Sequence, residues 1–175
     1  YTARVGSTEL GAAPGIQLAV WRDGAPVLAH AAGKSNLETG TDVRVDSIFR
    51  IGSLTKQFAA ALAAVLAEQG KLELDAPASR YLPAFAALPA FSVRELIHHT
   101  AGLHADEAGE GLPGQVSQQR LAEAIAGQAT PFDFPPGTAW QYSNANYVVL
   151  GAIIEAVTGQ PLAEVGRTRL FEPLG

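Results

Sequence analysis

The apolar pattern of this chain changes type at Gly52, and that change limits the folds open to it. Before Gly52, residues 15–21 and 26–32 alternate as strands do, and Asp23-Gly24 between them is typical of a tight hairpin turn. A polar connection, residues 34–46, and a short β-like run, residues 47–51, follow. The pattern predicts an α+β fold with a sheet portion at residues 1–52 and a helical region at residues 53–175.

Apolar residues recur at helical spacing through most of the second part. The predicted helices are residues 53–69, 93–99, 118–128, 146–158 and 161–170. The first would carry a core stripe of Leu54, Phe58, Leu62, Val65 and Leu66.

The predicted hairpin has too few partners. A lone hairpin is marginal in water, because its apolar faces need more sheet or a helix to pack on. No further convincing strand pattern follows Ile51, although the 175 residues are 47% hydrophobic and only 17% charged, as in a globular domain. We therefore expect an incomplete domain, residues 1–175, whose sheet a C-terminal remainder or a second chain would complete.

Composition excludes several classes of partner. The formal net charge of -5 argues against nucleic acid, and the longest apolar run, residues 58–67, is half a membrane span. The chain has no cysteine, so disulfides and thiolate metal sites are excluded. It also has no methionine, so we expect the true start to lie elsewhere, and a removed export signal stays open.

Ser53 and Lys56 depart from the residue pattern usual at the start of a helix. The first turn of a helix carries partial positive charge, and a capping box would place Glu or Gln where Lys56 stands. Residues three apart on a helix are neighbours, and a serine nucleophile needs an adjacent base such as a neutral lysine. The alternative is an ordinary N-cap serine with an exposed lysine. Ser92-Val93-Arg94-Glu95, by contrast, is a capping box of the structural kind.

Tyr142-Ser143-Asn144 forms a second group of chemically able residues, after the turn at Pro135-Pro136-Gly137. Tyr142 can pass a proton, and Asn144 can donate to a bound carbonyl while holding a lysine. The alternative is a turn in which Ser143 or Asn144 caps the next helix and Tyr142 fills the core.

Together these groups give the chain a resemblance to a known family. It resembles the serine hydrolases of the penicillin-binding-protein-like superfamily, nearest to the class C β-lactamases with their D-alanyl-D-alanine carboxypeptidase and esterase relatives. The resemblance runs through nearly all the chain: the hairpin around Asp23-Gly24, residues 49–58, Lys71-Leu72-Glu73-Leu74-Asp75, Leu96-Ile97-His98-His99-Thr100-Ala101-Gly102-Leu103, residues 136–144 and residues 170–175.

The resemblance implies a β-lactamase/transpeptidase-like fold and a role for each site residue. Ser53 would be the acylated nucleophile, and its N–H would be half of the oxyanion hole. Lys56 and Tyr142 would share the general-base and general-acid work, and Asn144 would contact the substrate amide. No cofactor is implied. A periplasmic or secreted location is favoured, with the cytoplasm as the alternative.

One family feature is absent from this sequence. The third motif, Lys-Thr-Gly or a His-x-Gly variant on a later strand, does not occur after Tyr142. The family also continues past Pro173-Leu174-Gly175. Both points agree with an N-terminal part of a longer protein.

His98, His99 and His104, with Asp106 and Glu107, could suggest a metal cluster. No helical i, i+4 histidine pair is present, and the resemblance explains His98-His99 structurally. The sequence therefore predicts no metal.

The leading prediction is a serine hydrolase that acts through an acyl-enzyme on a small-molecule or peptide substrate. Whether that substrate is an amide, a β-lactam or an ester stays open. The alternatives are a non-catalytic sensor domain that binds peptidoglycan or β-lactams, and a fragment that is inert until a complementing chain joins it.

Overall fold

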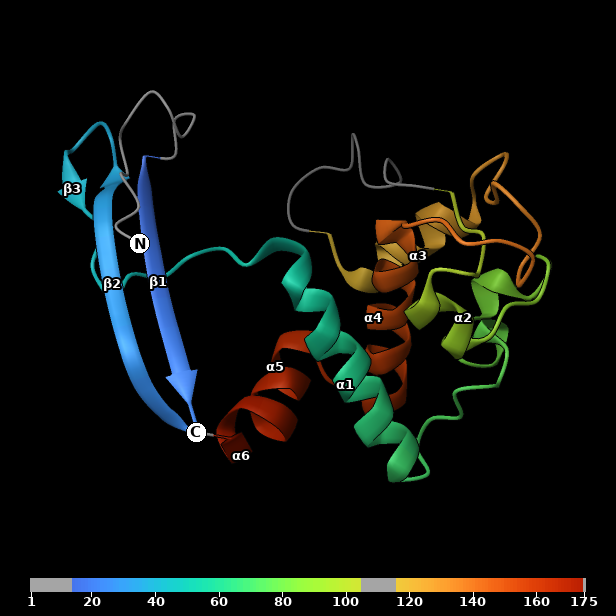
Figure 1. Ribbon diagram of the computed structural model, residues 1–175. Coiled ribbons are helices and arrows are strands. Elements are labelled where there is room, and N and C mark those ends of the chain that lie inside the picture. Colours follow the sequence, from blue (N-terminus) through green and yellow to red (C-terminus); the bar gives the residue numbers. More distant parts are fainter. Residues whose placement is uncertain (1–13, 105–115, 175) are drawn as a thin grey trace. The chain divides into compact units, whose positions relative to one another are not determined.

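The chain divides into two compact units, Tyr1–Ile51 and Gly52–Gly175. The computed structural model describes residues 14–104 and 116–174 (Figure 1). The described part of the first unit is a sheet, and the described part of the second is mostly helical.

The first unit is built on the predicted hairpin. Strands β1 (Gly15–Arg22) and β2 (Ala25–Asn36) pair antiparallel, from Gly15 opposite Gly33 to Arg22 opposite Ala25. Asp23 and Gly24 have φ values of 52° and 76° at the turn. Two successive positive φ values are what a tight hairpin turn of this type requires, so the hairpin prediction is confirmed.

The rest of the first unit differs from the prediction. The connection predicted for residues 34–46 contains the end of β2 and a third strand, β3 (Thr41–Asp42), which pairs with it. The strand predicted at residues 47–51 was wrong, because these residues are irregular. A strand needs a neighbour for its backbone groups, and the described residues supply none here. Instead, the side-chain amide of Gln17 donates to the carbonyls of Arg44, Val45 and Ser47.

The second unit is organised around α4 (Asn144–Thr158), against which α1 (Thr55–Glu68), α2 (Val93–His98) and α3 (Gln118–Ala126) pack. The α4 side chains of Val149, Leu150, Ile153 and Ile154 are fully buried. Each such burial contributes about 1.5–3 kcal/mol relative to exposure. Short 3₁₀ turns lie at Gly52–Leu54, Ala78–Arg80 and Pro83–Phe85. This core holds the starts of α1 and α4 next to each other.

Helix starts show where local sequence signals were enough to predict the structure and where they were not. The capping box at Ser92 and Glu95 is confirmed by both of its hydrogen bonds. Helix α4 begins two residues before its predicted start, because the Ser143 side chain accepts from the Ala145 N–H and caps it. Leu54 was wrongly predicted as core, since it lies in the 3₁₀ turn and is exposed.

The last predicted helix is interrupted. α5 (Leu162–Gly166) leads into a π-helical turn (Arg167–Phe171) and then α6 (Glu172–Leu174). A regular α-helix would set the Pro173 ring against the carbonyl of Arg169. The wider turn before Pro173 relieves that conflict.

Among the described residues, no single helix is long and apolar enough to cross a membrane. Of the helix pairs in the described part of the chain, one reaches that length and composition, α4 with Leu162–Leu174, and this pair is bent by 76°.

Candidate active site

Ser53 does not cap the helix that follows it. Gly52 has a φ of 54°, a value that glycine adopts without steric cost, and the chain then makes a 3₁₀ turn through Leu54. The N-cap of α1 is Leu54, with no side-chain capping bond. The interpretation of Ser53 as an ordinary N-cap is therefore wrong, and its hydroxyl makes other contacts.

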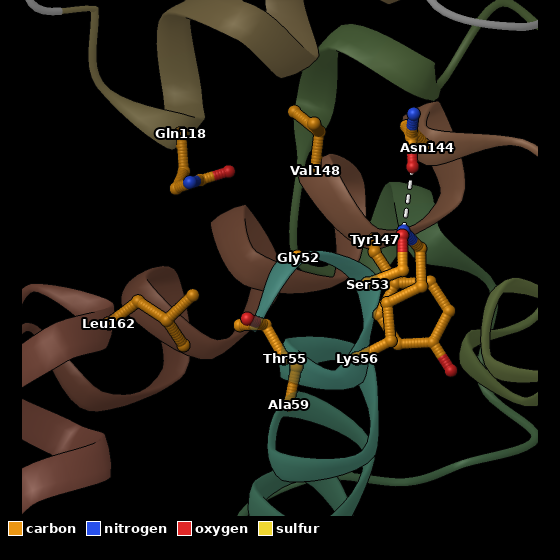
Figure 2. Close-up of a pocket in the computed structure, with 10 residues that line it drawn as sticks. All are labelled: Gly52, Ser53, Thr55, Lys56, Ala59, Gln118, Asn144, Tyr147, Val148 and Leu162. Atoms are coloured by element: carbon orange, nitrogen blue, oxygen red, sulfur yellow. Dashed lines mark hydrogen bonds between the residues drawn. The ribbon is translucent and has the colours of Figure 1, made fainter. Parts of the chain in front are cut away.

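Lys56 lies one turn further on, and its amine connects two parts of the site. Its Nζ donates to Ser53 Oγ at 3.2 Å and to Asn144 Oδ1 at 2.6 Å. Figure 2 shows the Asn144 side chain directed at this amine from the start of α4. Nζ also lies 4.7 Å from the ring centroid of Tyr142 and 5.5 Å from that of Tyr147, so both aromatic rings lie within cation–π distance of this amine. The side chain is half-buried rather than exposed.

Tyr142 and Asn144 approach Ser53 and Lys56 from the segment that begins α4. The Tyr142 hydroxyl is 2.6 Å from Ser53 Oγ and 3.4 Å from Asn144 Oδ1. Tyr142 is 43% exposed, so the alternative that it fills the core is wrong. The capping alternative was right for Ser143, which is fully buried at the start of α4.

The structure thus brings all four predicted site residues together within one unit. Ser53 Oγ has a hydroxyl on one side and an amine on the other, each within hydrogen-bonding distance. A hydroxyl placed between two groups able to exchange protons is the arrangement that nucleophilic catalysis requires.

Two further residues, Tyr147 and His99, complete the surroundings of the site. Tyr147 Oη donates to the carbonyl of Ile97 at 3.1 Å, and burial together with the nearby Tyr142 raises the pKa of Tyr147. The sequence prediction missed Tyr147, although its position three residues after Asn144 places it on the same helix face.

His99 is buried, and its ring packs against those of Tyr142 and Tyr147, at centroid distances of 4.6 and 5.3 Å. Burial and the charge of Lys56 lower the pKa of His99. No local sequence signal separated this histidine from its neighbour His98, which is exposed.

The residues considered for a metal site have other surroundings. His99 Nδ1 accepts hydrogen bonds, and His104 Nδ1 pairs with the Asp133 carboxylate. Asp106 and Glu107 lie outside the described residues. Within residues 14–104 and 116–174, no group of three histidine or acidic side chains could hold a metal ion.

A pocket of about 350 Å³ opens beside Ser53 and Lys56. Figure 2 shows Ser53, Lys56 and Asn144 on one side of it and Leu162 and Gln118 on the other, with Val148 above and Thr55 and Ala59 below. The polar groups of the site thus lie at one end of a partly apolar pocket, as in many small-molecule sites.

Comparison with known proteins agrees with this geometry. Penicillin-binding protein 4 of Amycolatopsis lactamdurans is 35% identical over 167 residues, which cover 93% of this chain and 43% of that protein. Esterase EstB of Burkholderia gladioli is 35% identical over 179 residues, which cover 89% of this chain and 44% of that protein. The chain therefore spans less than half the length of these relatives.

Solved structures show the same fold. The D-amino acid amidase from Ochrobactrum anthropi SV3, complexed with L-phenylalanine, matches with a TM-score of 0.78 and 29% identity over 93% of this chain and 45% of the amidase. The β-lactamase/transpeptidase-like fold expected from the sequence is confirmed. Because the Beta-lactamase family model also matches residues 7–175, almost the whole sequence, the chain belongs to the Beta-lactamase family.

Proposed function

We propose that this chain carries the nucleophile of a serine hydrolase that works through an acyl-enzyme on Ser53. The observation that carries the proposal is the position of Ser53 Oγ, 2.6 Å from Tyr142 Oη and 3.2 Å from Lys56 Nζ. The family, which includes esterases, carboxypeptidases and amidases, supports the same reaction class.

Each residue has a distinct part in the proposed reaction. Ser53 Oγ bonds to the substrate carbonyl carbon while its proton passes to the Tyr142–Lys56 pair. That pair then protonates the leaving amine or alcohol as its bond to carbon breaks. Water, activated by the same pair, hydrolyses the acyl-serine and restores the free hydroxyl. Asn144 holds Lys56 through Oδ1, and its amide NH₂ group is the donor for a substrate carbonyl.

The substrate class proposed is a small amide, β-lactam or ester, in keeping with class C β-lactamases and D-alanyl-D-alanine carboxypeptidases. The pocket beside Ser53 is partly apolar, which suits an apolar acyl group. Parallel rates on a small ester, a β-lactam and a D-alanyl peptide would rank these classes.

The reaction is tested by covalent labelling. Incubation of the protein with a fluorescent fluorophosphonate or a fluorescent penicillin, followed by peptide mass spectrometry, should place the adduct on Ser53. Ser53→Ala should abolish the label. Ser92→Ala, which removes the capping serine of α2, should lower the melting temperature and keep the label. An adduct elsewhere, or an unchanged label in Ser53→Ala, would overturn the proposal.

A penicillin adduct that forms but is never released would instead indicate a sensor that binds β-lactams without turnover. No adduct at Ser53 in a folded wild-type protein would overturn the proposed function.

A further inference from the structure

His99 holds the Tyr142 segment from both sides. Its backbone carbonyl accepts the Gln141 N–H at 3.1 Å, and its ring Nδ1 accepts the Ser143 N–H at 3.2 Å. The two hydrogen bonds therefore fall on the residues immediately before and after Tyr142. One residue therefore holds the backbone on both sides of Tyr142.

The ring of His99 also supports the phenol directly. It stacks on the Tyr142 ring at 4.6 Å between centroids and 29° between planes. Asn146 Nδ2 lies 3.1 Å from Nδ1, and Ser143, Asn146 and His99 are 0%, 1% and 9% exposed. Tyr142 is 43% exposed, whereas the three residues that hold its segment are buried.

The backbone of His99 shows that this arrangement is specific. His99 ends α2 with a φ of 59°, a left-handed conformation uncommon in residues other than glycine, asparagine, aspartate and histidine. This conformation turns its carbonyl toward Gln141 while the side chain points at α4. Nδ1 accepts the Ser143 N–H, so it cannot itself carry a proton. The neutral ring is therefore protonated at Nε2.

We propose that His99 is a positioning residue that holds the Tyr142 hydroxyl at Ser53. Its effect on the reaction rests on the proposed acyl transfer, but its hold on the segment can be measured without any reaction. His99 touches neither the nucleophile nor the substrate in this scheme and acts through Tyr142.

Two variants separate the contributions of the ring. His99→Phe keeps a stacking ring and removes the Nδ1 acceptor. His99→Asn places an amide oxygen close to the position of Nδ1 and tolerates the positive φ. His98→Phe is the matched control, because His98 is the preceding residue and is exposed.

The first measurement is amide hydrogen exchange at Ser143. We expect faster exchange in His99→Phe, and exchange close to wild type in His99→Asn and His98→Phe. Equal exchange in all four proteins would overturn the positioning role.

The second measurement is the rate of Ser53 labelling by a fluorophosphonate as a function of probe concentration. His99→Phe should lower the rate at saturation by about 10- to 100-fold, as misplaced catalytic groups do, with the half-saturating concentration unchanged. His99→Asn should recover most of that rate. Wild-type labelling in His99→Phe would contradict the proposal.

The two measurements keep the two proposals apart. A wild-type protein that is not labelled at Ser53 would overturn the proposed function. Faster Ser143 exchange confined to His99→Phe would still support the hold of His99 on Tyr142.

Discussion

The Ser53 hydroxyl lies 2.6 Å from the hydroxyl of Tyr142, although 89 residues separate them in the chain. Lys56 Nζ reaches the same serine oxygen and is itself held by Asn144 Oδ1. The site therefore joins two chain segments, one at the start of α1 and one at the start of α4, through two polar contacts, Ser53–Tyr142 and Lys56–Asn144.

Removing the Tyr142 hydroxyl should slow acylation with little loss of stability. Tyr142→Phe keeps the ring that stacks on His99 and removes only the oxygen beside Ser53. Loss of a proton-transfer group lowers rates by about 10²- to 10⁴-fold. The rate of Ser53 labelling at saturating fluorophosphonate measures the effect. Tyr81→Phe is the control, since the Tyr81 hydroxyl accepts the Glu73 N–H away from the site. A Tyr142→Phe protein as fast as wild type would remove Tyr142 from the proposed mechanism.

Replacing Lys56 with arginine should abolish the proposed base while keeping a cation. An arginine side chain stays protonated in proteins and presents a planar group too large for a single amine position. Lys56→Arg should therefore lower the labelling rate by about 10²- to 10⁴-fold. Lys71→Arg, at an exposed lysine just after α1, should leave the rate unchanged. Comparable rates in both variants would show that Lys56 contributes charge alone.

The lowered pKa of His99 makes stability depend on pH in a defined direction. Burial and the charge of Lys56 depress the pKa of His99 below its ordinary value of 6.5. Between the folded pKa and 6.5, the unfolded chain binds the proton and the folded chain does not. Stability should therefore fall as the pH drops below 6.5, until the folded pKa is reached.

Urea unfolding between pH 5 and pH 8 measures this dependence. His99→Asn, which cannot titrate, should show a weaker fall over the same range. His98→Asn, at the exposed neighbouring histidine, is the control and should keep the wild-type dependence. Identical pH dependence in wild type and His99→Asn would contradict this assignment.

Gly102 should be intolerant of a side chain for two separate reasons. Its φ is 77°, and a Cβ atom there would lie 2.1 Å from the Phe134 carbonyl oxygen. The left-handed conformation costs a residue with a Cβ about 1–2 kcal/mol, and the overlap with backbone adds about 1–3 kcal/mol. Gly102→Ala should therefore destabilise the chain more than Gly70→Ala, which has a similar φ of 69° and no atom within 4 Å. Midpoints of denaturant unfolding would measure the difference, and equal losses would show that the backbone yields at Phe134.

Local signals predicted most of the secondary structure. The hairpin, the capping box at Ser92 and the glycine ends of α1 and α4 depend on residues within a turn of one another, so the sequence carries them directly. The proximity of Ser53 and Lys56 is of the same kind, since any helical turn places residues three apart side by side.

What the sequence alone could not determine is everything that needs a distant partner. β3 formed because the end of β2 was beside it, whereas residues 47–51 had no neighbouring strand among the described residues. Ser53 does not cap α1 because it lies in a 3₁₀ turn before the helix, and Leu54 takes the N-cap position. His98 and His99 are the same residue type, and only the packing of α2 on α4 placed one ring under Tyr142 and left the other in solvent.

The sequence by itself determined the resemblance to the family, the hairpin, most of the helices and a serine with a lysine one turn away. The tertiary structure decided that Tyr142, Asn144 and His99 surround that pair. The physical reason is the range of the interactions: helix periodicity and caps arise from neighbours along the chain. The contacts of Ser53 with Tyr142, and of Lys56 with Asn144, exist only because the buried faces of α1, α2 and α4 pack together.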